Sequence, residues 1–275
     1  MSNFLIVGGT GKVGGRLTRS LRAQGHQASA ASRTAGDVRF DWHDPASQAP
    51  ALQGADGIFL IGPGSATDWS GLVPPFLARA EASGVRRVVL LSARAVEFLP
   101  DGAAGRAEGA VRHGPVAWTI LRPSHFAQNF TEAMFVPVND EVVAPVGHGA
   151  EPFVDAADIA EVAAAILTGE GYAAETIGIS GPVAITFSQA VEILSEHAGR
   201  PLRFVAEDQL EYAGRLRAAG TPEGYITWRM AMLDGIRRGA DAYISDGVPR
   251  VLGRPATDFA TWAAREAGVL KGAAQ

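Results

Sequence analysis

The sequence contains no cysteine, which excludes disulfides, thiolate metal sites and thiol nucleophiles. Its longest apolar runs, such as residues 88–91, are far shorter than the ~20 residues that a membrane-spanning helix needs. The first residues lead straight into a strand-like segment, without the charged region and cleavable apolar segment of a signal peptide. We therefore expect a cytoplasmic protein with no membrane partner.

The sequence also lacks an excess of positive charge, because its formal net charge is −5 at pH 7. This balance argues against binding nucleic acid through a positively charged face. With 47% hydrophobic and 19% charged residues, the composition is that of an ordinary globular protein. At 275 residues the chain has room for one large or two small domains, and we expect its partner to be a small molecule.

Glycine is abundant, and its most informative cluster follows the apolar residues at positions 4–7. Gly8, Gly11 and Gly14 form G-x-x-G-x-x-G, and positions 9, 11 and 14 also match G-x-G-x-x-G. In a strand–turn–helix unit, such glycines allow a tight turn, close approach to a pyrophosphate and close packing of helix on strand. The start of the helix then directs free N–H groups toward the phosphates.

The surrounding pattern supports this interpretation of the glycines. Val13, Leu17 and Leu21 lie on one face of a helix that ends near Gly25, and a second strand is predicted over residues 27–32. Further strands over 38–42, 56–63, 85–91 and 116–121 alternate with helices, which predicts a doubly wound α/β fold with a parallel sheet. Residues 1–180 are expected to form a dinucleotide-binding domain, and 181–275, with about 123–150, a smaller, mainly helical substrate lobe.

The cofactor is predicted from the end of the second strand, where NAD-preferring folds of this type usually carry an acid. Ser32 and Arg33 stand there instead, and an arginine accommodates the 2′-phosphate of NADP. The alternative is a solvated loop residue at position 33. Because ligands bind beyond the carboxyl ends of parallel strands, the other residues predicted to line this site are Asp41, Trp42, Gly62, Pro63 and Ser92.

Several segments together resemble the NmrA-like branch of the atypical short-chain dehydrogenase/reductases. They are the glycine motif, the segment Val-Val-Leu-Leu-Ser92-Ala, residues 118–130 (Trp-Thr-Ile-Leu-Arg-Pro-Ser-His-Phe-Ala-Gln-Asn-Phe) and residues 152–160 (Pro-Phe-Val-Asp-Ala-Ala-Asp-Ile-Ala). The resemblance implies a Rossmann-like NAD(P)-binding domain and a small C-terminal substrate lobe. It also implies cofactor contacts from Gly8, Thr10, Gly11, Lys12, Val13 and Arg33. The branch contains NADPH-dependent quinone and imine or iminium reductases, and also redox-sensing regulators without turnover.

The sequence lacks the Tyr-x-x-x-Lys pair with which the wider superfamily transfers protons. Without that pair, hydride transfer from the nicotinamide suits an acceptor that already carries an electron sink, such as a quinone or an iminium ion. His125, just past a predicted strand, is the best remaining proton donor, since imidazole titrates near neutral pH. Its alternative role is packing or lining the substrate pocket. His43 with Asp41 and Asp44 is interpreted as a solvated loop, and no metal is expected.

Two other functions remain open from the sequence. One is a redox sensor that binds NADP(H) and performs no chemistry, and the other is a non-redox catalyst, such as a cyclase or isomerase, on the same fold. The helical C-terminal segment, which is long enough to enclose a substrate, favours an NADPH-dependent oxidoreductase.

Overall fold

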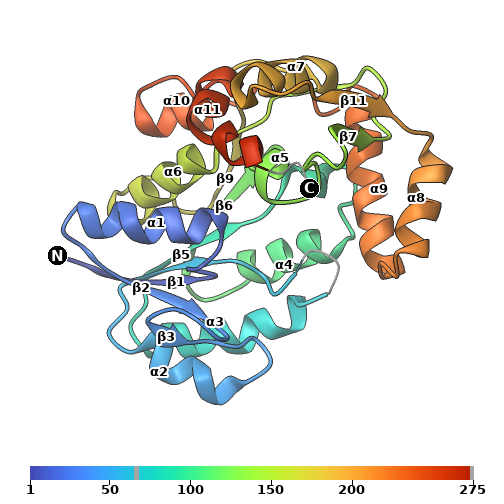
Figure 1. The fold of residues 1–275 in the computed structure, drawn as a ribbon. Helices are drawn as coiled ribbons and strands as arrows, with labels where there is room; N and C mark the ends of the chain where they lie inside the picture. Colours follow the sequence, from blue (N-terminus) through green and yellow to red (C-terminus); the bar gives the residue numbers. More distant parts are fainter. Residues whose placement is uncertain (65–67, 273–275) are drawn as a thin grey trace. The chain divides into compact units, whose positions relative to one another are not determined.

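The computed structural model describes residues 1–64 and 68–272, which form two compact units (Figure 1). Unit 1 comprises residues 1–123, 156–178 and 250–253, and unit 2 comprises residues 124–155, 179–249 and 254 onward. The chain therefore leaves unit 1 after residue 123 and returns to it at residue 156.

A seven-stranded sheet forms the centre of unit 1, in the order β3-β2-β1-β4-β5-β6-β9. All pairings from β3 to β6 are parallel, so these strands end at the same edge of the sheet. This order confirms the predicted doubly wound α/β fold. The strands are β1 (Asn3–Val7), β2 (Gln27–Ser32), β3 (Val38–Arg39), β4 (Gly57–Leu60), β5 (Arg87–Leu91), β6 (Ala117–Pro123) and β9 (Glu175–Ile179).

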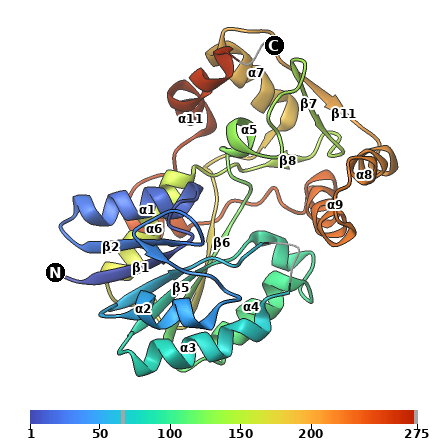
Figure 2. The ribbon, with the colours of Figure 1, turned by 60° about the horizontal axis from the view of Figure 1, so that its bottom comes forward.

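Helices cover both faces of this sheet, as a parallel sheet with apolar strands requires (Figure 2). On one face α1 (Lys12–Ala23) packs against α6 (Ala156–Thr168). The other face carries α2 (Gln48–Leu52), α3 (Val73–Ala82) and α4 (Ala103–Arg112). Short 3-10 helices lie at Pro45–Ser47, Ser70–Leu72 and Arg94–Glu97.

Unit 2 is built around a cluster of phenylalanine rings. Its elements are α5 (Asn129–Glu132), β7 (Glu141–Ala144), β8 (Ala150–Glu151), β10 (Ile185–Thr186), α7 (Phe187–Ala198), β11 (Arg203–Ala206), α8 (Gln209–Ala218), α9 (Glu223–Arg237) and α11 (Phe259–Glu266). Phe130 and Phe135 are buried against Phe153 and Phe187, with ring centroids 4.8–5.7 Å apart. These phenylalanines therefore belong to the core of unit 2.

The two remaining helical segments are α10 (Gly247–Leu252), which begins in unit 2 and ends in unit 1, and a 3-10 turn at Ala267–Gly272.

The long elements agree with the sequence patterns, and the short ones do not. The sequence Thr186-x-x-Gln189 is typical of a capping box, and this box is present at the start of α7, which ends at Gly199 in the left-handed conformation. The strand expected over 38–42 is only two residues long, and β7, β8, β10 and β11 were not expected. Among the residues described, no helix is long and apolar enough to span a membrane.

The N-cap of α11 gives a test of stability. Asp258 accepts hydrogen bonds from the backbone N–H and the hydroxyl of Thr261, and these bonds hold the pKa of Asp258 below its ordinary value. A carboxyl with a lowered pKa stabilises the fold above about pH 4, and this contribution is lost as the pH falls through its folded pKa. We expect Asp258→Ala to lower the free energy of unfolding by about 1 kcal/mol at pH 7.

The difference between wild type and Asp258→Ala in denaturant titrations should shrink as the pH falls from about 4 through the lowered folded pKa of Asp258, below which the carboxyl is protonated in both states. Asp258→Asn is the matched control, since asparagine caps equally well without a charge. A pH-independent difference would contradict the assignment of the charged cap.

Candidate active site

The turn between β1 and α1 has the backbone geometry that its glycines predict. Gly8 has φ of +75°, a conformation that costs little only in glycine. A Cβ on Gly14 would lie 2.3 Å from the carbonyl oxygen of Gly8, so a side chain there would push the helix away from the strand. The turn is tied to β2 because the N–H groups of Gly8 and Gly9 both donate to Ala31.

This turn leaves the start of α1 suited to an anion. The N-cap is Gly11, which supplies no side-chain cap, and the first turn contains no acidic residue. The first N–H groups of a helix have no intrahelical acceptor, and the helix dipole favours negative charge there. Thr10 is exposed, Lys12 is half-buried, and Val13 is turned into the core. A pyrophosphate fits this turn, and the predicted contacts from these residues remain predictions.

The residue directly after β2 is a cation that forms no ion pair within the described part of the chain. Arg33 is exposed, and within the described residues no carboxylate lies in ion-pair range of it. Ser32 accepts a hydrogen bond at 2.8 Å from the Ala35 N–H, which closes the loop. The nearest acid along the chain, Asp37, is already bound by the Ala30 N–H and by the Arg22 guanidinium. This edge of the sheet therefore offers positive charge to a ligand.

Two predicted residues lie between β3 and the first 3-10 helix. Asp41 is half-buried and accepts a hydrogen bond from the His43 N–H. Trp42 is buried, donates its indole N–H to the Ile61 carbonyl at 3.0 Å and packs against the ring of Trp69. This placement favours a core role for Trp42, and its predicted role in lining the cofactor site remains a prediction.

The residues after β4 and β5 lie at the same edge of the sheet. Gly62 packs so closely on the Trp69 indole that a Cβ there would lie 2.4 Å from the ring, and Pro63 beside it is exposed. Ser92, which follows β5 directly, donates its backbone N–H to the Leu121 carbonyl at 2.8 Å. The structure thus brings the glycine turn, Ser32, Arg33, Gly62, Pro63 and Ser92 to the carboxyl edge of one sheet.

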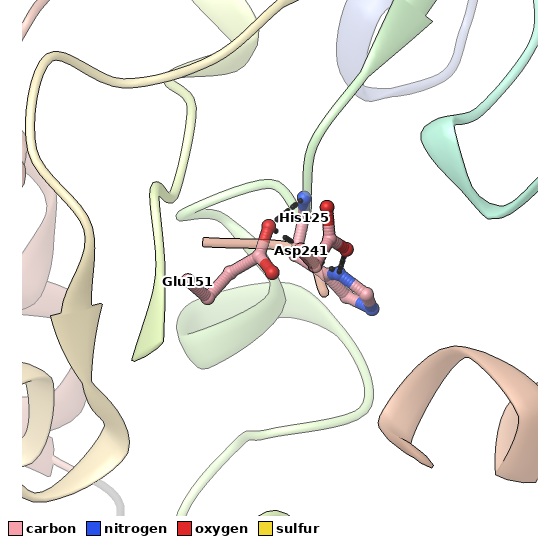
Figure 3. A group of neighbouring side chains, drawn as sticks. All are labelled: His125, Glu151 and Asp241. Carbon is pink, nitrogen blue, oxygen red and sulfur yellow. Dashed lines mark hydrogen bonds and ion pairs between the residues drawn. The ribbon is translucent and has the colours of Figure 1, made fainter. Parts of the chain in front are cut away.

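His125 follows the end of β6 by two residues and belongs to a buried cluster in unit 2 (Figure 3). Its Nδ1 atom lies 3.6 Å from a Glu151 carboxylate oxygen and 3.9 Å from an Asp241 carboxylate oxygen. Glu151 also accepts the His125 backbone N–H at 2.9 Å. Two carboxylates therefore lie beside one buried imidazole, a side chain that can hold or donate a proton.

This trio also has a metal-binding composition, since one ligand atom from each side chain lies within 4.8 Å of the others. The histidine was a sequence candidate, whereas Glu151 and Asp241 were not. They are 26 and 116 positions further along the chain, so no local spacing pattern links the three residues.

Tyr212 is one of four tyrosines, and it is a poor replacement for the missing Tyr-x-x-x-Lys pair. Tyr212 is buried in α8, and burial raises the pKa of this phenol, which makes it a weaker acid. The only lysines in the sequence are Lys12 and Lys271, and neither stands four positions after a tyrosine. A proton donor other than a tyrosine–lysine pair is therefore needed if the reaction consumes a proton.

Comparison with known proteins agrees with this geometry. A family model described as NAD(P)H-binding matches residues 8–170, which include the glycine turn and most of the sheet. The uncharacterized oxidoreductase YesF of Bacillus subtilis is 34% identical over 274 residues, covering 96% of this chain and 95% of the relative. The NAD(P)H azoreductase of Xenophilus azovorans is 29% identical, covering 97% and 99%.

A solved structure shows the same fold. Triphenylmethane reductase of Citrobacter sp., complexed with NADP(H), superposes with a TM-score of 0.72 at 22% identity, covering 96% of this chain and 99% of the other. The relatives confirm the prediction of an NAD(P)H-dependent oxidoreductase, and the fold is that of the predicted branch. The chain belongs to the NAD(P)H-binding family, and its fold agrees with the predicted resemblance to the NmrA-like branch.

Proposed function

We propose that the protein is an NADPH-dependent reductase that delivers hydride to a small, electron-poor acceptor, such as a quinone or an iminium ion. The observation that carries the choice of cofactor is the exposed Arg33 directly after β2. An acid at this place would repel a 2′-phosphate, and the nearby acid, Asp37, is engaged by other groups. Arginine binds a phosphate through charge-assisted hydrogen bonds.

The residues proposed to bind the cofactor lie along the carboxyl edge of the sheet in unit 1. The glycine turn and the first N–H groups of α1 hold the pyrophosphate, and Arg33 holds the 2′-phosphate. When bound, the reduced nicotinamide supplies the hydride. His125, whose ring lies beside the carboxylates of Glu151 and Asp241, donates a proton when formation of the product requires one.

The proposed class of acceptor rests on the absence of the tyrosine–lysine pair from the sequence. An ordinary ketone accepts hydride only when an acid polarises its carbonyl oxygen, and the described part of the chain contains no tyrosine–lysine pair for this purpose. A quinone or an iminium ion already has low-lying acceptor orbitals or positive charge. One relative of this chain is an azoreductase, whose name also indicates an electron-poor double bond.

The deciding experiment is a titration with NADPH and NADH followed by absorbance at 340 nm against quinones, N-alkyl iminium ions and an azo dye. Oxidation of NADPH by one acceptor class supports the reductase. NADPH binding without turnover would instead support a redox sensor. Failure to bind either cofactor would overturn the proposal.

Arg33→Ala tests the choice of cofactor. We expect its affinity for NADPH to fall about tenfold or more, because a charge-assisted contact is lost, while its affinity for NADH changes less than about twofold. Arg39→Ala is the matched control, since Arg39 is also exposed in this region but is paired with Asp44 at 2.6 Å. Equal weakening of both cofactors by Arg33→Ala would remove Arg33 from the proposed role.

His125→Gln tests the proton donor, because glutamine keeps a hydrogen-bonding side chain beside Glu151 and Asp241 but does not titrate. Reduction of a quinone consumes a hydride and a proton, whereas reduction of an N-alkyl iminium ion consumes only a hydride. We expect turnover with the quinone to fall about 100-fold and to lose its pH dependence, with the iminium rate and NADPH affinity nearly unchanged. An equal loss for both acceptors would assign His125 to packing.

A further inference from the structure

Ser92 directly follows β5 at the carboxyl edge of the sheet, and its hydroxyl already forms a hydrogen bond. Its Oγ donates to a carboxylate oxygen of Glu108 at 2.6 Å. A serine hydroxyl has a single hydrogen and two lone pairs. While this bond exists, Ser92 has no proton to offer to a carbonyl group, and only its lone pairs face other partners.

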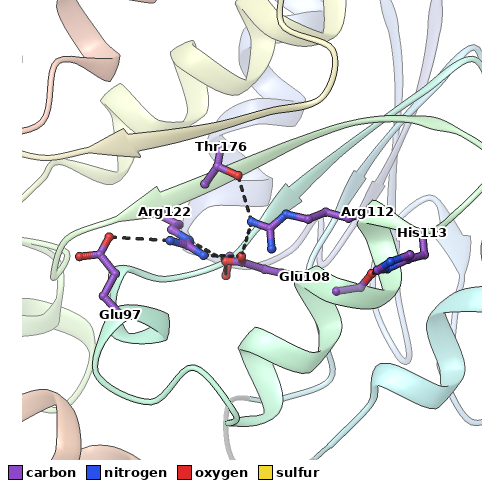
Figure 4. Close-up of polar contacts among 8 residues, drawn as sticks. Glu97, Glu108, Arg112, His113, Arg122 and Thr176 are labelled. Carbon is purple, nitrogen blue, oxygen red and sulfur yellow. Dashed lines mark hydrogen bonds and ion pairs between the residues drawn. The ribbon is translucent and has the colours of Figure 1, made fainter.

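Glu108 is a fully buried side chain of α4 and is held from several directions (Figure 4). Arg122 donates to both of its oxygens, at 2.9 and 2.7 Å. Arg112 donates a further hydrogen bond at 2.9 Å and is itself bound to Thr176 at 3.1 Å. The carboxylate is thus fixed in place by two guanidinium groups that come from β6 and from its own helix.

The charges set the direction of the Ser92 hydrogen bond. An ionised carboxylate accepts hydrogen bonds and donates none, and Glu108 forms ion pairs with two arginines. The serine hydrogen therefore points at Glu108. A buried carboxylate with this many donors is not free to rotate away, so the lone pairs of Ser92 keep a constant direction.

The position of Ser92 in the sheet identifies which part of the cofactor meets those lone pairs. In the strand order β2-β1-β4-β5, Arg33 lies one strand to one side of the glycine turn, and Ser92 lies two strands to the other side. Two strand spacings correspond to about 10 Å. With the pyrophosphate at the turn and the adenosine half toward β2, the nicotinamide riboside half extends toward β5.

We propose that Glu108 is a positioning residue that fixes the Ser92 hydroxyl as a hydrogen-bond acceptor for the nicotinamide riboside half of the cofactor, an inference that rests on the proposed NADPH binding. The donor is an N–H of the carboxamide or a ribose hydroxyl, which share this chemistry. Ser92 then orients the cofactor and does not polarise the substrate.

The first test measures NADPH affinity directly, by fluorescence titration of the complete protein. Ser92→Ala should weaken NADPH binding about three- to tenfold, the loss expected for one hydrogen bond. Ser92→Thr keeps the hydroxyl and should restore most of the affinity. Thr176→Ala is the control, because it removes a bond at the far side of the same network and should leave NADPH affinity unchanged.

A cofactor analogue identifies the donor. In the reduced 3-acetylpyridine analogue of NADPH, a methyl group replaces the amide NH2. If Ser92 accepts from the carboxamide, Ser92→Ala weakens NADPH but not this analogue. Weakening of both to the same extent assigns the bond to a ribose hydroxyl, and either result supports the acceptor role.

A double-mutant cycle isolates the contribution of Glu108. Glu108→Gln should weaken NADPH about threefold or more in the wild-type background but should have almost no further effect in the Ser92→Ala background. A purely structural glutamate would weaken NADPH equally in both. If Glu108→Gln lowers the melting temperature too far for binding studies, the Ser92→Ala and analogue titrations decide alone.

Two outcomes would overturn the inference. One is an unchanged NADPH affinity in Ser92→Ala, and the other is a lower kcat with unchanged NADPH affinity, which would make Ser92 a donor to the substrate. Both differ from failure of the proposed function, in which the wild-type protein itself binds no NADPH.

Discussion

The contact between Gly14 and the Gly8 carbonyl determines how close α1 lies to β1, and the rest of unit 1 depends on it. The turn can be this tight because neither residue carries a side chain, and because Gly8 adopts a positive φ. The close approach brings the start of α1 to the edge where β2, β4 and β5 also end. A single backbone constraint thus creates a place for phosphate and aligns Arg33 and Ser92 on opposite sides of it.

The chemistry of this edge is dominated by groups that bind and orient rather than by acids. Ser92 gives its only proton to Glu108. This arrangement favours the proposed acceptors, which carry their own electron sink, and it leaves the groups at this edge to orient the reactants. The absence of the tyrosine–lysine pair and the direction of the Ser92 hydrogen bond therefore lead to the same class of substrate.

Much of unit 1 was predictable from sequence, because local signals specify it. Alternating apolar strands and helices fixed the fold class, and the capping box and glycine positions located helix ends. The Ser92–Glu108–Arg122 network was not predictable, since its members are 14–30 positions apart and none is part of a spacing pattern. The environment of the Trp42 side chain could not be predicted for a related reason. Trp42 follows a short strand, and only the tertiary structure shows that its ring packs against Trp69 and that its indole N–H donates to the Ile61 carbonyl.

The segment that leaves unit 1 at Pro123 is flanked by two buried glutamates, one in each unit. Glu108 binds the Arg122 side chain in unit 1, and Glu151 accepts the His125 backbone N–H in unit 2. Burying a carboxylate costs free energy that an ion pair or hydrogen bonds only partly recover, so apolar residues would stabilise the fold at least as well. The presence of these two buried glutamates around residues 122–125 is better explained by a role in positioning this segment than by a contribution to the stability of the fold. Glu108 holds the Arg122 side chain at the end of β6, and Glu151 holds the His125 backbone near the start of unit 2, so each glutamate fixes the conformation of its own part of this segment.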